Sequence, residues 1–140
     1  MAEKCLFCEI AAGRVAAPVV FESDRFLAFL DHRPVFPGHC LLIPRPHYPT
    51  LPDLPAADAG PLLGHAARLC SAIEQAMGAQ GTFVAMNNRV SQSVPHLHVH
   101  IVPRRQKDGL RGFFWPRQKY QDAEEMERVR SSIERAMNQS

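Results

Sequence analysis

Residues 96–102 constrain the fold of this chain more than any other stretch. They read His-Leu-His-Val-His-Ile-Val, so that histidine and aliphatic side chains alternate. In a strand, such alternation sends His96, His98 and His100 to one face and the aliphatic residues to the other. The aliphatic face indicates core, whereas three histidines together have no packing reason to exist. We therefore predict a strand over 96–102 with a core on one side and chemistry on the other.

The spacing of the three histidines argues against one metal ion held by all of them. The first and third lie roughly 13 Å apart along a strand, whereas metal–nitrogen bonds measure about 2 Å. Two of the three could share an ion, and the third would then have a different task.

The rest of the chain predicts a single α+β domain over residues 1–140. The predicted helices cover 5–13, 62–77 and 122–137, and the predicted strands cover 19–22, 25–31, 39–44, 82–87 and 96–102. Strands that follow one another through short turns indicate antiparallel pairing. Strands interrupted by one long helix favour α+β over a parallel sheet. Residues 45–60 and 104–119 are predicted loops, and Asp58 is the predicted cap of the long helix.

Charge and hydropathy narrow the possible partners. The 140 residues include 16 Lys and Arg against 14 Asp and Glu, so bulk charge does not imply a nucleic acid partner. No apolar run approaches the length of a membrane span, and no basic segment precedes an apolar one near Met1. We therefore expect no membrane partner and a cytoplasmic location.

Two cysteines near the start form a second candidate site. Without a signal peptide, Cys5-x-x-Cys8 indicates either a metal site or a redox pair. With His47 and His96, the pair would complete the tetrahedral set of two sulfurs and two nitrogens that zinc favours in structural sites. His47 could instead be a solvated loop residue. Assigning His96 to the metal would leave His98 and His100 free for chemistry.

A neutral imidazole can act as a nucleophile, and His98 is the candidate. It could attack a phosphorus atom and hold a nucleotidyl group covalently. This requires one unprotonated ring nitrogen, with the other donating to an acceptor that fixes the tautomer. It also requires donors around the phosphate oxygens, for which Asn88, Gln92 and Ser93 are the nearest candidates.

Residues 96–102 resemble the signature of the histidine triad (HIT) family without departure. The resemblance implies a five-stranded, mostly antiparallel sheet with a long central helix, and two protomers that commonly join their sheets in a homodimer. The opening Cys-Leu-Phe-Cys-Glu-Ile of residues 5–10 resembles the zinc-binding bacterial branch of the family. In that branch the zinc ligands match Cys5, Cys8, His47 and His96.

The resemblance also implies an activity and residue roles. The protein is expected to cleave AMP or GMP from a leaving group through a covalent nucleotidyl-His98 intermediate, with His100 on the phosphate and His39 assisting the relay. Asp31 would hold the ribose hydroxyls, and Gln92 and Ser93 would lie near the phosphate. The positions that match the purine sandwich are Leu6, Phe7, Phe29 and His32. Phe7 and Phe29 could equally serve the core, and Asp31 and Asn88 could be ordinary turn residues.

Some features depart from the family or leave alternatives open. The loop before Gln92 is about two residues shorter than usual, with Arg89 in the place of a glycine. Trp115 resembles part of a tail that reaches toward the leaving group in one branch. Four arginines could contact further phosphates or be solvated: Arg104, Arg105, Arg111 and Arg117. The alternatives are a dinucleoside polyphosphate phosphorylase, a non-enzymatic nucleotide-binding scaffold, and a metallohydrolase that uses the triad and the cysteines as one centre.

Overall fold

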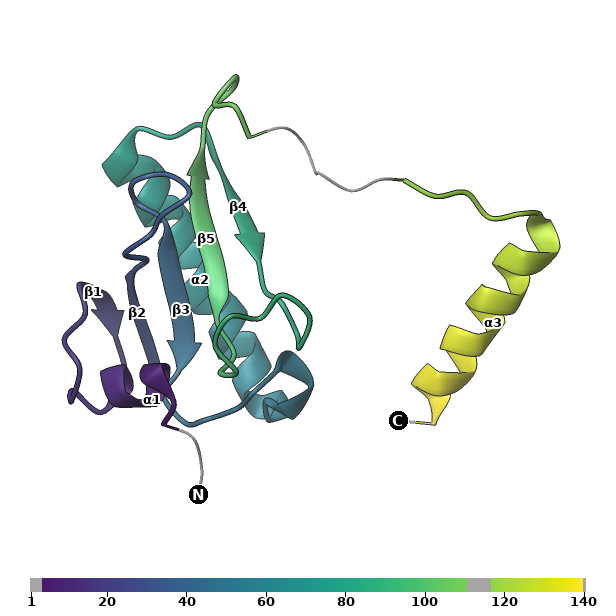
Figure 1. The fold of residues 1–140 in the computed structure, drawn as a ribbon, viewed down its shortest axis with the longest axis horizontal. Helices are drawn as coiled ribbons and strands as arrows, with labels where there is room; N and C mark the ends of the chain where they lie inside the picture. The colour runs from purple at the N-terminus through teal and green to yellow at the C-terminus, as the bar shows by residue number, and fades with distance from the viewer. Residues whose placement is uncertain (1–3, 111–116, 140) are drawn as a thin grey trace. The chain divides into compact units, whose positions relative to one another are not determined.

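The structure is a computed structural model that describes residues 4–110 and 117–139. The chain divides into two compact units, one ending at Asp108 and one beginning at Gly109 (Figure 1). The interpretation of the whole chain as a single domain stays a prediction. Over the described ranges, no helix combines the length and the apolar character that crossing a bilayer requires.

The first unit is built on a five-stranded sheet in which every neighbouring pair is antiparallel. The strands are β1 (Val19–Glu22), β2 (Phe26–Leu30), β3 (Cys40–Pro44), β4 (Gly81–Ala85) and β5 (Val99–Arg104). Their order across the sheet is β1-β2-β3-β5-β4. The predicted α+β class and the mostly antiparallel sheet are confirmed.

Helices cover the two faces of this sheet unequally (Figure 1). The long helix α2 (Ala56–Met77) lies on one face, where its apolar side packs on Leu97, Val99 and Ile101. The short helix α1 (Leu6–Ala11) lies on the other face, where Phe7 packs with Phe29 and other strand residues. The alternation of aliphatic residues and histidines therefore separates two faces, as predicted.

Two predicted boundaries differ from the structure by more than two residues. The long helix begins at Ala56 rather than at residue 62, directly after Pro55, which makes no side-chain cap but whose carbonyl accepts from the Asp58 amide at 2.9 Å. Asp58 is not the cap but lies in the first turn, where it accepts two hydrogen bonds from the Arg25 guanidinium, at 3.0 and 2.6 Å. The triad strand begins at Val99 rather than at residue 96. The main chain before it pairs elsewhere, since the Leu97 amide donates to the Tyr48 carbonyl.

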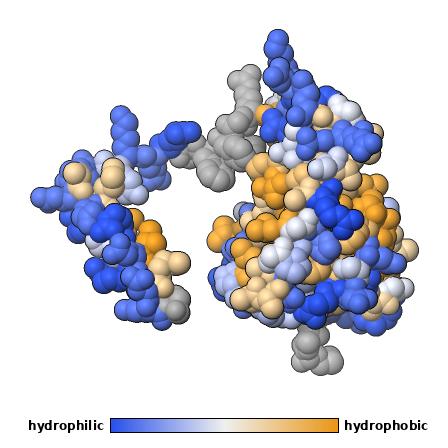
Figure 2. All heavy atoms as spheres, turned by 180° about the vertical axis from the view of Figure 1, so that it is seen from behind, coloured by the Kyte–Doolittle hydropathy of each residue, from blue (hydrophilic) through white to orange (hydrophobic). Residues whose placement is uncertain are grey.

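Among its described residues, the second unit contains one helix, α3 (Ala123–Asn138). Its N-cap, Asp122, accepts a hydrogen bond from the Glu125 amide. Within α3 no residue is buried, and its apolar stripe is exposed to solvent (Figure 2). That stripe consists of Met126, Val129, Ile133 and Met137.

We expect that truncating the buried side chain at the middle of β3 strongly destabilises the protein, because that side chain belongs to the core on the α2 face. Leu42 has no exposed surface, so Leu42→Ala removes buried methyl groups and leaves a cavity. We expect a loss of about 3 kcal/mol in the free energy of unfolding, measured by urea denaturation. Leu63→Ala is the matched control, because 59% of Leu63 is exposed. An equal loss in both variants would contradict this view of the core.

Candidate active site and metal site

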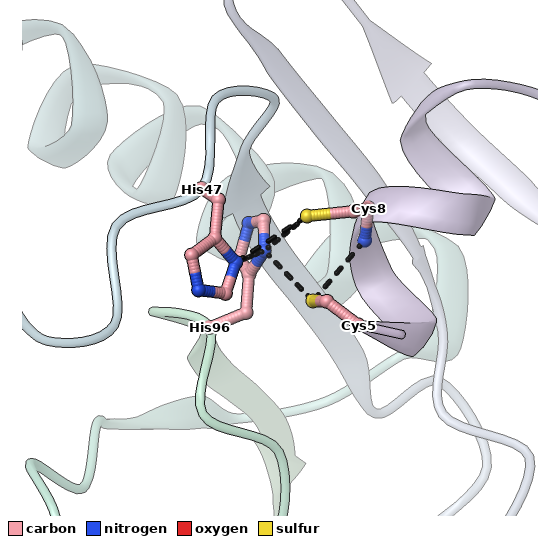
Figure 3. Close-up of side chains that lie close together, drawn as sticks. All are labelled: Cys5, Cys8, His47 and His96. Carbon is pink, nitrogen blue, oxygen red and sulfur yellow. Dashed lines mark hydrogen bonds between the residues drawn. The ribbon is translucent and has the colours of Figure 1, made fainter. Parts of the chain in front are cut away.

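Four predicted ligands meet between α1, the segment after β3 and the approach to β5 (Figure 3). The His96 Nδ1 atom lies 3.3 Å from Cys5 Sγ, 3.5 Å from Cys8 Sγ and 3.3 Å from His47 Nδ1. Cys8 Sγ also lies 3.3 Å from His47 Nδ1. A zinc ion with bonds of about 2.0–2.3 Å holds tetrahedral ligands about 3.3–3.8 Å apart. The spacing of these atoms therefore fits a tetrahedral zinc ion.

The tautomer of His96 supports the same assignment. Its Nε2 atom lies 2.7 Å from the Pro44 carbonyl oxygen, which can only accept, so Nε2 carries the proton. The Nδ1 lone pair is then aimed at the two sulfurs and His47. A second hydrogen bond of this kind orients most metal-bound imidazoles. When bound, zinc would cross-link residues 5–8 to the segment after β3, which carries His47, and to the segment before β5, which carries His96.

The thiols must lose their protons to bind metal. Burial raises the pKa of Cys8 to about 11, and the neighbouring Cys5 thiol adds to this effect. The metal-free Cys8 is therefore protonated at neutral pH, and metal binding must displace that proton.

His98 has the tautomer that a nucleophile needs. Its Nδ1 atom lies 2.8 Å from the His96 carbonyl oxygen, so Nδ1 carries the proton. The neutral ring then has its lone pair on Nε2. His98 is 3% exposed and meets the ring edge of Phe7, with the ring centroids 5.1 Å apart. A main-chain atom thus determines which nitrogen of His98 carries the lone pair.

His39 and His100 form a chain of hydrogen bonds that starts at a backbone amide. The Val35 amide donates to His39 Nδ1 at 3.1 Å, which places the His39 proton on Nε2. That proton points at His100 Nδ1, 3.0 Å away. The neutral His100 ring must then carry its proton on Nε2, so His100 can donate to a phosphate oxygen.

Burial keeps both of these rings neutral. It lowers the pKa of His100 to about 4, with the neighbouring His98 and His39 adding to the effect. It also lowers the pKa of His39, although the Asp31 carboxylate, 3.7 Å away, opposes that shift. A neutral donor at His100 is therefore available across the physiological pH range.

The Asp31, His39 and His100 side chains also lie close enough to suggest a second metal site. The hydrogen bond at Val35 argues against it. A metal on His39 Nε2 would move the ring proton to Nδ1, where it would face the Val35 N–H. The cluster is better suited to passing hydrogen bonds than to holding an ion.

A hollow beside His98 gathers most of the predicted substrate-binding residues. Its lining includes seven predicted residues together with Ile10 and Val94: Leu6, Phe7, Phe29, Asp31, His32, Ser93 and His100. Phe7 and Phe29 are also core residues, with ring centroids 5.5 Å apart. Asp31 also forms a turn, accepting from the Arg33 amide at 2.9 Å. Phe7 and Phe29 are therefore both core residues and lining residues of the hollow, and Asp31 both forms a turn and lines the hollow.

Asn88 and Gln92 are not among the residues that line this hollow. Asn88 Oδ1 accepts from the Leu51 amide at 2.8 Å. The Gln92 side chain donates to the Pro49 carbonyl at 2.6 Å and accepts from the Arg89 amide at 2.9 Å. Both amides brace the loop before the triad, and Arg89 there adopts a left-handed backbone with φ of 71°.

Of the four arginines that could contact further phosphates, three lie within the described residues. Arg104 pairs with Asp108 at 2.6 Å, and the Arg105 side chain donates to the Met77 carbonyl. Arg117 belongs to the second unit, whereas Arg111 and Trp115 lie outside the described residues.

Another hollow, of about 440 Å³, lies between β1 and α2. It is lined by Phe21, His65 and Arg68 among others, and the Arg68 guanidinium lies 5.5 Å from the Phe21 ring centroid. It offers no ordered pair of histidines comparable to His98 and His100. We therefore place the chemistry in the hollow beside His98.

The main-chain groups that orient the rings could not be predicted from the sequence. The Pro44 and His96 carbonyls and the Val35 amide fix three tautomers. Every residue has a carbonyl and every residue except proline has an amide N–H, so no side-chain pattern could have marked these.

Comparison with known proteins identifies the family of this chain. Residues 12–107 match the model of the HIT domain. The chain therefore belongs to the HIT family.

Two curated relatives have enzymatic names. Adenylylsulfatase HINT3 of Arabidopsis thaliana is 34% identical over 108 residues, which are 76% of this chain and 55% of that protein, so this chain spans about half its length. Adenosine 5'-monophosphoramidase hnt1 of Schizosaccharomyces pombe is 32% identical over 114 residues, 80% of this chain and 83% of that protein.

Two solved structures are also similar. A HIT family protein from Bacillus subtilis is 33% identical with a TM-score of 0.86, covering 95% of this chain and 96% of that one. A zinc-bound histidine triad family protein from Mycobacterium smegmatis is 31% identical with a TM-score of 0.73, covering 97% of each chain. The similarity to a zinc-bound protein is consistent with zinc in the cysteine–histidine cluster.

Because Cys5, Cys8, His47 and His96 together can hold one zinc ion, we expect about one zinc ion per chain in the purified protein. Cys8→Ser should sharply lower the zinc content, measured by elemental analysis, because a serine hydroxyl is a much weaker zinc ligand than a thiolate. Cys70→Ser, on α2 and outside the cluster, should retain the metal. Full zinc content in the Cys8 variant would contradict the assignment.

The burial of His100 predicts a specific pH dependence of stability. The unfolded chain takes up a proton on this ring below pH of about 6.5, whereas the folded protein does so only near pH 4. The free energy of unfolding should therefore fall as pH drops through this window. In His100→Gln it should fall less, as measured by urea denaturation at several pH values. Parallel curves for the two proteins would contradict this prediction.

Proposed function

We propose that this protein is a nucleotide hydrolase or transferase that cleaves AMP or GMP from a leaving group. The observation that carries the proposal is the hydrogen bond from His98 Nδ1 to the His96 carbonyl, which leaves the Nε2 lone pair for attack. The hollow beside His98 supports the proposal with residues suited to a nucleoside and a phosphate. The family and the names of the two enzymatic relatives support the same class of reaction.

The proposed reaction takes place in two displacements at phosphorus. His98 Nε2 attacks the α-phosphorus, a nitrogen–phosphorus bond forms, and the bond to the leaving group breaks. Ser93, which lines the same hollow, can supply a proton to the departing atom. Water or another acceptor then attacks the phosphorus and returns a proton to the Ser93 oxygen. The nitrogen–phosphorus bond breaks, its electron pair returns to Nε2, and the nucleotide is released.

Hydrogen bonds lower the barrier in both steps. The bond of Nδ1 to the His96 carbonyl stabilises the positive charge on His98 while Nε2 holds the nucleotidyl group. The His100 Nε2 proton can donate to a phosphate oxygen where negative charge gathers. His39 keeps that proton in place through its bond to His100 Nδ1.

The hollow also accounts for nucleoside recognition. The Asp31 carboxylate can accept hydrogen bonds from both ribose hydroxyls. Apolar and aromatic side chains, Phe7 and Phe29 among them, can contact the flat purine. Zinc in the cysteine–histidine cluster has a structural role in this scheme. The homodimer and the cytoplasmic location stay predictions.

A substrate panel tests the proposed class. The panel pairs AMP or GMP with an amine, a sulfate, or a second nucleotide through a polyphosphate, and products are identified by chromatography. Release of the nucleoside monophosphate supports a hydrolase, and release of a nucleoside diphosphate in phosphate buffer indicates a phosphorylase. Binding without any product would overturn the enzymatic proposal in favour of a scaffold.

His98→Ala should lower turnover by more than about 10³-fold, because it removes the nucleophile. Wild-type protein quenched during turnover in an alkaline denaturant, because nitrogen–phosphorus bonds to histidine are labile in acid, should carry one nucleotidyl group on His98, detected by peptide mass spectrometry. His65→Gln, on α2, is the control and should keep its activity. Turnover at the normal rate in His98→Ala would refute a covalent intermediate on this residue.

A further inference from the structure

The segment that carries Cys5 and Cys8, at the start of α1, also forms a wall of the proposed nucleotide pocket. Leu6 and Phe7 lie between the two cysteine ligands in sequence, and both line the hollow beside His98 together with Ile10 of the same helix. One short segment of chain therefore faces the metal with its cysteines and the pocket with its apolar residues.

Helix α1 depends on tertiary contacts, and at its C-terminal end the Arg45 guanidinium donates to the Ala11 carbonyl at 2.9 Å. It has six residues and one buried side chain, Phe7, and helices this short are unstable without tertiary contacts. Its N-cap is Cys5, whose Sγ accepts from the Cys8 amide at 3.4 Å. Both metal ligands thus lie at the first turn, so metal binding fixes the end of the helix that carries Phe7.

Phe7 connects the metal cluster with the reacting ring. Its ring centroid lies 5.9 Å from that of the ligand His96, 5.1 Å from that of His98 and 5.5 Å from that of Phe29, each in an edge-on arrangement. A shift of α1 would therefore alter the pocket wall and the packing against the nucleophile together.

We propose that metal binding and nucleotide binding are coupled through α1, with Phe7 as the positioning residue between them. The proposal rests on the nucleotide site described above. Zinc orders the wall that the nucleotide contacts, and the nucleotide holds in place the helix that carries the two thiolates. By thermodynamic linkage, each ligand must then raise the affinity for the other by the same factor.

Two equilibrium measurements on the full chain test the coupling. The zinc affinity is measured by competition with a chelator, with and without saturating AMP, and the AMP affinity is measured by calorimetry on zinc-loaded and zinc-free protein. We expect both affinities to rise by an equal factor of about ten, within the usual range of coupling. Inorganic phosphate at the same concentration controls for direct chelation of zinc and should have no effect.

Phe7→Leu tests the path of the coupling. This variant keeps an apolar side chain but loses the aromatic edge contacts, so the coupling factor, which is the ratio of the zinc affinities with and without AMP, should fall toward one. Phe21→Leu, which alters a ring in the hollow between β1 and α2, is the matched control and should keep the full factor. Full coupling in Phe7→Leu would overturn the role of Phe7.

The remaining outcomes separate this inference from the proposed function. Equal AMP affinity with and without zinc would overturn the coupling and leave the proposed function standing. If neither AMP nor GMP binds the zinc-loaded protein, both proposals fail.

Discussion

The antiparallel pairing of β3 with β5 determines where the histidines meet their partners. Its register sets Leu41 opposite His100, and His39 lies just before β3, so the two rings come together at one end of the strand. At the other end, the Pro44 carbonyl reaches the His96 ring. One strand thus orients both outer members of the triad, and the cross-strand hydrogen bonds that hold the sheet also set the geometry of the site.

The three triad rings can differ in function because different hydrogen-bond partners set their tautomers: two main-chain carbonyls for His96 and His98, and the His39 ring for His100. His96 presents Nδ1 to the metal cluster, His98 presents Nε2 to the hollow, and His100 presents an Nε2 proton. Burial keeps the pKa of His96 and of His100 low, and in a low-dielectric site each hydrogen bond is stronger than in water. Three chemically identical side chains can therefore act as ligand, nucleophile and donor.

Much of this arrangement could be predicted from the sequence, because hydrophobic alternation and turn residues are local signals. The strands and the separation of the two faces are examples. The meeting of Cys5, Cys8, His47 and His96 is instead expected from the spacing of the cysteines and the resemblance to the HIT family. The start of α2 at Ala56 and the loop-bracing roles of Asn88 and Gln92 could not be predicted. Those features depend on partners distant in sequence, such as Arg25 for the first turn of α2 and Pro49 for Gln92. The Val35 amide is likewise placed by the fold of its loop.

The atom that orients His98 belongs to the peptide backbone of its neighbour. Replacing the His96 side chain would abolish a metal ligand, yet the carbonyl that holds the His98 proton would still be present in any amino acid at that position. Metal retention and nucleophile orientation can therefore diverge separately during evolution. A descendant of this protein could replace the proposed zinc site with apolar packing and keep the lone pair of His98 on the same nitrogen.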